Sequence, residues 1–314
     1  MTKYIKTNNG KLEELVKAEK GCWISMTAPS IADLYLISEL YQIDLDDLKA
    51  ALDVDERSRI EVEENYTMVV VNIPTIEVNN HKELFNTIPT SIFITEHAVI
   101  TICAEETPVI KSFESGNIKD FHTQMKSRFI LQLLYRTATL YLQYLRTIDK
   151  KSEEVENELH KSTQNRELFE LLKLEKSLVY FSTALRSNEV VLEKLLRNET
   201  IKQYPEDSDL LEDVIVENKQ AIEMTNIYSG ILSGTMDAFA SVISNNLNIV
   251  MKFLAIITIV MSIPTIIFSA YGMNLKGIGM PFAGSQHGFA IVVAMSAIIS
   301  LMVALLFRKL KLFK

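Results

Sequence analysis

The chain has 314 residues, of which 48% are hydrophobic and 23% are charged, and its formal net charge is −8. This balance excludes a disordered chain, which would be less hydrophobic, and a fully membrane-embedded chain, which would carry fewer charges. The negative charge argues against nucleic acid as a partner and favours cations. Cys22 and Cys103 are the only cysteines and form no CxxC pair, so neither a disulfide framework nor a cysteine zinc site is supported.

Residues 1–115 are predicted to form a mixed α/β domain. In "APSIADLYLISELYQI", Ser30 precedes Asp33 at the spacing of a helix capping box. The stretches "RIEVEENYTMVVVNIP" and "TSIFITEHAVITIC" alternate like strands and are rich in β-branched residues, with a turn at Glu96-His97. The N-terminus lacks the apolar core of a signal peptide, so we expect this domain to stay in the cytoplasm.

Residues 116–204 are predicted to form a helical hairpin. The stretch that begins "DFHTQMKSRFILQLL" and the stretch that begins "RELFELLKLEKSL" both carry apolar residues three and four positions apart, as packed amphipathic helices do. A third helix is predicted to start after Pro205, with Asp209 and Glu212 as its capping box. It is expected to continue to residue 274 as both a stalk and a membrane span, about 95 Å long up to Gly272 at 1.5 Å per residue.

Two apolar runs near the C-terminus are predicted to cross a membrane. Residues 253–274 contain no ionisable side chain except Tyr271, residues 289–307 contain none, and each run is long enough for about 30 Å of hydrocarbon. The basic residues of the tail 308–314 follow the second run directly, whereas the connecting loop 275–288 holds only Lys276. The positive-inside rule therefore predicts cytoplasmic N- and C-termini and an external loop in a multi-pass protein of the cell (inner) membrane.

Nearly every residue along one face of the first span is polar or small. Steps of three and four residues backwards from Gly272 select Ser269, Thr265, Ser262, Thr258, Ala255, Met251 and Asn248, and below the membrane Ser244, Ser241, Asp237, Gly234 and Gly230. Within a membrane, such a face more often marks close helix packing than contact with water. The carboxylate of Asp237 and the amide of Asn248 on the same face instead favour a polar path.

A polar path of this kind requires several copies of the chain. Two spans cannot enclose a pore, so the sequence predicts a homo-oligomer with the first span around its axis. Thr, Ser and Asn side chains suit a cation that keeps its water, and Met251 and Leu254 would supply an apolar constriction that gates by dewetting.

The tetrapeptide Tyr271-Gly272-Met273-Asn274 ends this span, after a long stalk and before a second span and a basic tail. In this setting the chain resembles the CorA magnesium-channel family over its whole architecture, most specifically from Asp237 to Asn274. The resemblance implies an α+β cytoplasmic domain, long stalk helices and two C-terminal transmembrane helices in a pentameric funnel. It also implies Mg²⁺ as transported and regulatory ion, with no organic cofactor.

The resemblance also implies roles for individual residues. Gly272, Met273 and Asn274 would form the outer selectivity filter, where a ring of Asn274 carbonyls meets the incoming ion. Asn248, Met251, Leu254, Ser262 and Thr265 would line the pore, and Asp237 would lie at its cytoplasmic end. Neutral amide oxygens suit Mg²⁺, which releases its water reluctantly.

Two carboxylates are expected from the resemblance to bind regulatory Mg²⁺ between neighbouring subunits. Asp213 matches the stalk position of the family, and Glu77, in "NYTMVVVNIPTIE", is the match for its partner in the α/β domain. Opposed carboxylates repel until a divalent ion neutralises them, so rising cytoplasmic Mg²⁺ would favour a closed state.

The sequence departs from the family in its external loop. Many members carry an acidic residue soon after the motif, whereas here Met280-Pro281 is followed by Phe282 and the loop 275–288 contains no Asp or Glu. Zn²⁺, Co²⁺ or Ni²⁺ therefore stay open as alternative cargo.

A membrane-anchored oligomeric scaffold is the alternative from another class, although an anchor does not need a polar stripe. An enzyme is not predicted, because the sequence contains no phosphate loop, no nucleophile elbow and no histidines at the spacing of metal ligands or of a catalytic triad.

Overall fold

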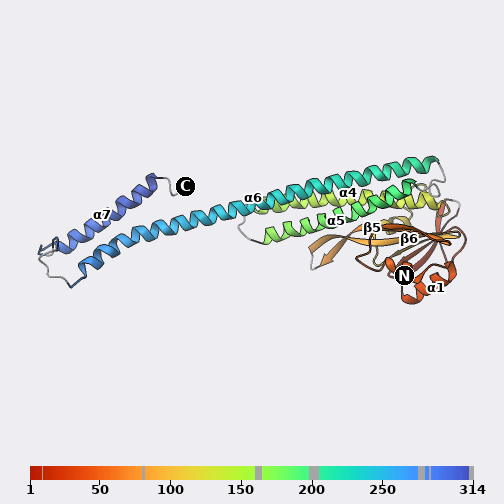
Figure 1. Cartoon of the computed structure of the whole chain (residues 1–314), viewed down its shortest axis with the longest axis horizontal. Coiled ribbons are helices and arrows are strands. Elements are labelled where there is room, and N and C mark those ends of the chain that lie inside the picture. Colours follow the sequence, from red (N-terminus) through yellow and green to blue (C-terminus); the bar gives the residue numbers. More distant parts are fainter. Residues whose placement is uncertain are drawn as a thin grey trace. The chain divides into compact units, whose positions relative to one another are not determined.

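The computed structural model describes residues 1–8, 10–79, 82–159, 165–197, 205–274, 280–282 and 284–310. The chain divides into two compact units, Met1–Thr235 and Met236–Lys314. Figure 1 shows both, and each is described by itself below.

The N-terminal unit is built on a seven-stranded sheet with the order β2-β1-β3-β7-β6-β5-β4. Its strands are β1 (Thr2–Asn8), β2 (Lys11–Leu15), β3 (Cys22–Thr27), β4 (Arg59–Val62), β5 (Tyr66–Asn79), β6 (Lys82–Thr95) and β7 (Ala98–Cys103). β3 and β7 pair in parallel and the other neighbours are antiparallel. The predicted turn at Glu96-His97 is confirmed, because it joins β6 to β7.

Two short helices cover one face of the sheet. α1 (Ile31–Tyr41) starts at the predicted capping box, where the Ser30 side chain accepts from the backbone of Asp33 and the Asp33 side chain accepts from the backbone of Ser30. Leu34 and Ile37 of α1 and Leu48 of α2 (Leu45–Ala50) are fully buried against strand residues. This cluster closes one side of the sheet.

Other helices cover the opposite face. They are α3 (Pro108–Glu114), α4 (Lys126–Leu159) and α5 (Asn165–Arg197). Trp23 is the centre of an aromatic cluster in which the rings of Phe113, Phe121 and Phe129 lie 5.2–6.4 Å from its own. Its indole N–H donates to Thr101 Oγ1 at 2.9 Å, so the ring is buried without an unpaired donor.

The stretch that begins at Asp120 was predicted to be helical, but it becomes helical only at Lys126, where α4 begins. The preceding segment is bound to β1 instead. Thr7 N donates to Thr123 Oγ1 at 3.0 Å, and Thr123 N donates to Thr7 Oγ1 at 3.2 Å. These bonds and the burial of Phe121 override the local helical pattern.

A buried polar network attaches α5 to the sheet. Asn188 accepts from Ser58 Oγ at 2.7 Å and from Asn72 N at 2.9 Å through the same oxygen, and its amide nitrogen donates to Asn72 O at 2.9 Å. The hydroxyl of Tyr141 in α4 also donates to Asn72 O at 2.9 Å. Because each of these groups is satisfied, the network fixes α4 and α5 on the sheet at little cost of desolvation.

The longest helix, α6 (Pro205–Tyr271), has 67 residues and belongs to both units. It starts at Pro205, so the predicted capping box at Asp209 and Glu212 is wrong and both residues lie within the helix. A proline at the first helical position explains the earlier start, because its missing N–H has no helical partner in any case. Leu211 and Val214 pack into the core on the α4–α5 face of the sheet.

The C-terminal unit contains the rest of α6 and α7 (Gly288–Lys309). Among the described helices, α6 and α7 are long and apolar enough to cross a membrane. Most of their apolar side chains in this unit are exposed, including Leu254 and Ile298. Exposed apolar helices of this length indicate contact with hydrocarbon or with other subunits.

Candidate ion pathway

The predicted polar stripe lies on the face of α6 that α7 leaves open. Ile256 is buried, and Val260, Ile263, Ile267 and Tyr271 are half-buried at intervals of three or four residues. α7 lies alongside this last part of α6 (Figure 1). Successive helical residues turn by about 100°, so the stripe points away from this covered row. Its members from Asn248 to Ser269 are exposed, except that Ser262 is half-buried.

Three hydroxyl groups on the stripe donate back to their own helix. Thr258 Oγ1 donates to Leu254 O at 2.8 Å, Ser262 Oγ to Ile259 O at 2.8 Å, and Thr265 Oγ1 to Met261 O at 3.1 Å. A hydroxyl has one donor and two acceptor sites. With the proton used inside the helix, each oxygen can only accept from a molecule on the open face, as from the outward-pointing hydrogens of a hydrated cation.

Met251, on the stripe, and Leu254, next to the stripe on the same side of α6, form an apolar step. Both side chains are more than half exposed, at 58% and 52%, and they lie between Asn248 and the hydroxyl-bearing residues. An apolar ring in a polar pore removes water from a short section, which is how a dewetting constriction operates.

Asp237 begins the stripe in the C-terminal unit, and its side chain is exposed. From there to Tyr271, Lys252 is the only other residue with a side chain charged at neutral pH. Asp237 is therefore the one acidic group along this part of α6. Its place below the apolar span suits a carboxylate that attracts cations without being buried in hydrocarbon.

The Gly-Met-Asn motif begins directly after the last helical residue. Gly272 N donates to Phe268 O at 2.9 Å and to Ser269 O at 3.2 Å, which completes the last turn of α6. A Cβ at Gly272 would meet these two carbonyls at 3.5 Å, an ordinary contact, and its φ is not in the left-handed region. The side chains of Met273 and Asn274 are exposed beyond the helix end.

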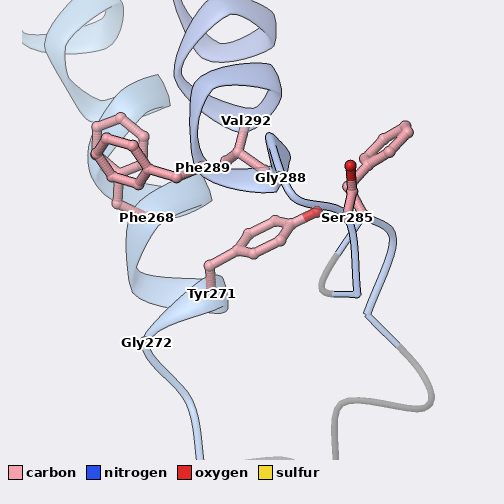
Figure 2. Close-up of a pocket in the computed structure, with 8 residues that line it drawn as sticks. Phe268, Tyr271, Gly272, Ser285, Gly288, Phe289 and Val292 are labelled. Atoms are coloured by element: carbon pink, nitrogen blue, oxygen red, sulfur yellow. The ribbon is translucent and has the colours of Figure 1, made fainter.

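A hydrogen bond that the sequence did not predict ties the end of α6, next to the motif, to the connecting loop. The hydroxyl of Tyr271 donates to Pro281 O at 3.0 Å. Figure 2 shows the Tyr271 ring reaching from the end of α6 towards the loop segment that carries Ser285, just before α7. The only sequence signal is the tyrosine beside the motif, because its partner is a backbone carbonyl ten residues away.

The two predicted regulatory carboxylates both lie in the N-terminal unit with exposed side chains. Asp213 is in the first part of α6 and Glu77 is in β5, opposite Leu84 of β6. Within the described residues of one chain, no group of three or more His, Cys, Asp or Glu side chains could hold a metal ion. Mg²⁺ keeps several waters and is usually bound by only one or two carboxylates, so a group of three protein ligands is not required for it.

Parts of the predicted external loop and of the predicted cytoplasmic tail lie outside the described residues. This holds for Lys276 and its neighbours at 275–279, for residue 283, and for the last four residues of the basic tail. The described part of the tail, Arg308 and Lys309, forms the last turn of α7. Basic side chains at a helix C-terminus interact favourably with the helix dipole.

Known proteins match the chain over nearly all of its length. A cobalt/magnesium transport protein CorA from Methanocaldococcus jannaschii is 27% identical over 296 residues, which cover 91% of this chain and 90% of that protein. The protein of the same description from Thermotoga maritima is 24% identical over 293 residues, with coverage of 92% and 82%. The complete structure of the CorA magnesium transporter from M. jannaschii superposes with a TM-score of 0.84 at 24% identity, covering 98% and 97% of the two chains.

The predicted fold is confirmed by this superposition, because a soluble α/β domain, long helices and two C-terminal apolar helices occur in the same order. The sequence model of the family described as CorA-like Mg²⁺ transporter protein matches residues 18–309. This family consists of membrane transporters and not of enzymes. With a match over most of its length, the chain belongs to the CorA-like Mg²⁺ transporter family.

Proposed function

We propose that this chain is one subunit of a homopentameric channel that conducts Mg²⁺ into the cell. The observation that carries the proposal is the stripe from Asp237 to Ser269, on the face of α6 that α7 leaves open. In a family of Mg²⁺ transporters, this arrangement supports α6 as the pore-lining helix and α7 as the outer helix.

The oligomer follows from the number of spans. One α6 presents a single polar face, and two spans per chain leave that face towards lipid unless other copies cover it. Exposed hydroxyl and amide groups are costly against hydrocarbon. Copies of α6 around an axis would place these groups on a water-filled path, and five is the number that the family resemblance implies.

The stripe suits an ion that travels with its water shell. Hydrated Mg²⁺ presents water hydrogens outwards, and the side-chain oxygens of Thr258, Ser262 and Thr265 accept hydrogen bonds. At the outer end, a ring of Asn274 amide oxygens would accept from the same shell before the ion enters. Neutral acceptors hold the hydrated ion weakly enough for it to leave again.

Gating in this proposal uses the apolar step and two distant carboxylates. Met251 and Leu254 would close the path by excluding water when the α6 helices approach. Asp213 of one subunit and Glu77 of a neighbour would bind Mg²⁺ when its cytoplasmic concentration is high. Bound Mg²⁺ would stabilise the closed assembly, so the cargo would limit its own entry.

In the proposed topology the protein lies in the inner membrane of the cell, with both termini in the cytoplasm. Arg308 and Lys309 at the end of α7 support this orientation, since basic residues are retained on the cytoplasmic side. The Gly-Met-Asn turn then faces outwards, and Mg²⁺ would enter along the membrane potential.

Co²⁺ is a second candidate cargo, because both relatives are described as cobalt/magnesium transport proteins. The absence of Asp and Glu from positions 275–288 also removes a hard anionic ligand from the outer mouth. Zn²⁺ and Ni²⁺ belong in the same comparison.

The test is uptake of each ion into proteoliposomes at a fixed inside-negative potential. Asn274→Ala is compared with wild type and with Asn246→Ala, an identical change on α6 away from the stripe. We expect Mg²⁺ uptake by wild type and by Asn246→Ala, and a loss of at least tenfold in Asn274→Ala.

The outcomes separate the alternatives. Uptake of Co²⁺ or Zn²⁺ without Mg²⁺ would retain the pore and replace the cargo. Equal loss in both asparagine variants would mean that the filter is not at Asn274. Inserted pentamers that pass none of the four ions would support the scaffold.

A further inference from the structure

An apolar pocket lies where α6 ends and α7 begins. Its volume is about 450 Å³, within the range of about 300–1,000 Å³ that is usual for ligand pockets. The lining comes from the end of α6, the loop and the start of α7: Phe268, Tyr271, Gly272, Phe282, Ser285, Gly288, Phe289 and Val292. Four of these eight residues are aromatic and none is charged at neutral pH.

On the loop side of this pocket, the backbone of the loop packs tightly against the start of α7. A Cβ at Gly288 would lie 2.3 Å from Phe282 O, so the start of α7 fits against the loop backbone only with glycine at this position. Phe282 has a φ of 63°, in the left-handed region that a bulky side chain rarely adopts. Such a conformation persists only where its surroundings hold it.

Polar groups at the pocket already have hydrogen-bond partners within the protein, so they do not need a polar ligand. The Tyr271 hydroxyl donates to Pro281 O, and Ser285 N donates to Phe282 O at 3.0 Å. Figure 2 shows Phe268 on α6, and Phe289 and Val292 on α7, around the same space. A pocket lined in this way gives water too few partners and favours a hydrocarbon.

The position of the pocket identifies the source of the hydrocarbon. It is flanked by the two helices that span the membrane, and Phe289 at its edge is 86% exposed. Tyrosine and tryptophan concentrate at the ends of membrane spans, at the level of the lipid headgroups, and Tyr271 lies at such an end. The pocket therefore opens to the bilayer rather than to a pool of soluble metabolites.

We propose that this pocket binds one acyl chain of a membrane phospholipid per subunit. The acyl chain would pack against Phe268, Phe289 and Val292 and against the ring of Tyr271. Tyr271 adjoins Gly272, so the bound chain would hold the end of α6 where the Gly-Met-Asn motif begins. The binding is independent of the ion that crosses; only the effect on transport rests on the proposed function.

The test uses tryptophan fluorescence and phospholipids with brominated acyl chains, which quench a tryptophan in contact with them. Phe289→Trp places a reporter at the pocket, and Ile298→Trp places one on the exposed side of α7, where Ile298 is 60% exposed. The natural Trp23 is buried in the N-terminal unit and gives a constant background. The full-length oligomer in detergent is titrated with brominated phosphatidylglycerol.

We expect saturable quenching of the Phe289→Trp reporter at about one lipid per subunit. The Ile298→Trp reporter should instead be quenched in proportion to the lipid fraction. Adding Val292→Ala, which enlarges the pocket, should weaken the saturable binding severalfold without changing the control. Proportional quenching of both reporters would overturn the proposal.

A second measurement separates a lipid from a neighbouring subunit. Phe289→Cys is combined with Ile266→Cys on α6, and the oligomer is oxidised. A disulfide between subunits with no saturable lipid binding would mean that a second copy fills the pocket, and the acyl-chain proposal would be wrong. Neither result changes the Mg²⁺ uptake expected for Asn274→Ala. The acyl-chain proposal and the channel proposal can therefore be contradicted independently of each other.

Discussion

The Thr265 hydroxyl donates to Met261 O, one turn earlier in α6, at 3.1 Å. The bond satisfies the only donor of this side chain within its own helix and leaves the oxygen as an acceptor on the stripe. Thr258 and Leu254 are related in the same way at 2.8 Å. The stripe therefore presents acceptors, which the outward-pointing water hydrogens of a hydrated cation can use.

Replacing Thr265 with valine tests this acceptor role. Valine has nearly the same shape but no oxygen, so we expect Mg²⁺ uptake to fall severalfold with the oligomer intact. Thr265→Ser keeps the hydroxyl and should retain most of the uptake. If valine and serine variants transport equally, the hydroxyl does not contact the hydrated ion.

The apolar step predicts a leak when it is made polar. Leu254→Ser would allow water to remain in the constriction, so Mg²⁺ uptake at high internal Mg²⁺ should rise several times above that of wild type. Ile257→Ser is the matched control, because Ile257 is also exposed but lies off the stripe. Unchanged inhibition in Leu254→Ser would place the constriction elsewhere.

The regulatory role proposed for Asp213 predicts a shift in inhibition rather than a loss of transport. Asp213→Asn removes one carboxylate from the proposed site between subunits, so closing should require several times more internal Mg²⁺. Glu212→Gln neutralises the adjacent exposed carboxylate and should leave inhibition as in wild type. Equal shifts in both variants would indicate a general charge effect and not a site.

The buried network at Asn188 predicts a loss of stability. Asn188→Ala would leave Asn72 N and Ser58 Oγ without their shared acceptor, at a cost of about 1–3 kcal/mol. Thr183→Ala, an exposed change on the same helix, should cost much less. Denaturant unfolding followed by Trp23 fluorescence measures both, and equal costs would mean that the network contributes little.

The raised pKa of the buried Tyr66 hydroxyl predicts a loss of stability at alkaline pH. Burial, with the hydrogen bond to Asp47 as a second cause, raises the pKa of Tyr66 from 10.0 to about 12. The folded state thus keeps the phenol proton that the unfolded state loses near pH 10. The stabilisation is full below pH 10 and is lost as the pH rises to about 12.

Tyr66→Phe should remove this part of the pH dependence. The melting temperature of wild type relative to the variant, measured from pH 8 to 12, should fall above pH 10. A constant difference across this range would contradict the assignment.

The sequence alone determined the features that depend on local pattern. Ser30 and Asp33 predicted the start of α1, because a capping box involves only neighbouring residues. The two apolar runs predicted both spans, because length and absence of charge suffice for a membrane helix. The stripe from Asp237 to Ser269 followed from helical periodicity, and Tyr-Gly-Met-Asn in its setting pointed to the family.

Features that depend on distant partners were decided only by the tertiary structure. The start of α4 at Lys126 depends on Thr7, more than a hundred residues earlier. The bond from Tyr271 to Pro281 O and the pocket beside it were also not predicted. Periodicity reports which face of a helix is polar, but a backbone carbonyl or a packed neighbour leaves no such pattern in the sequence.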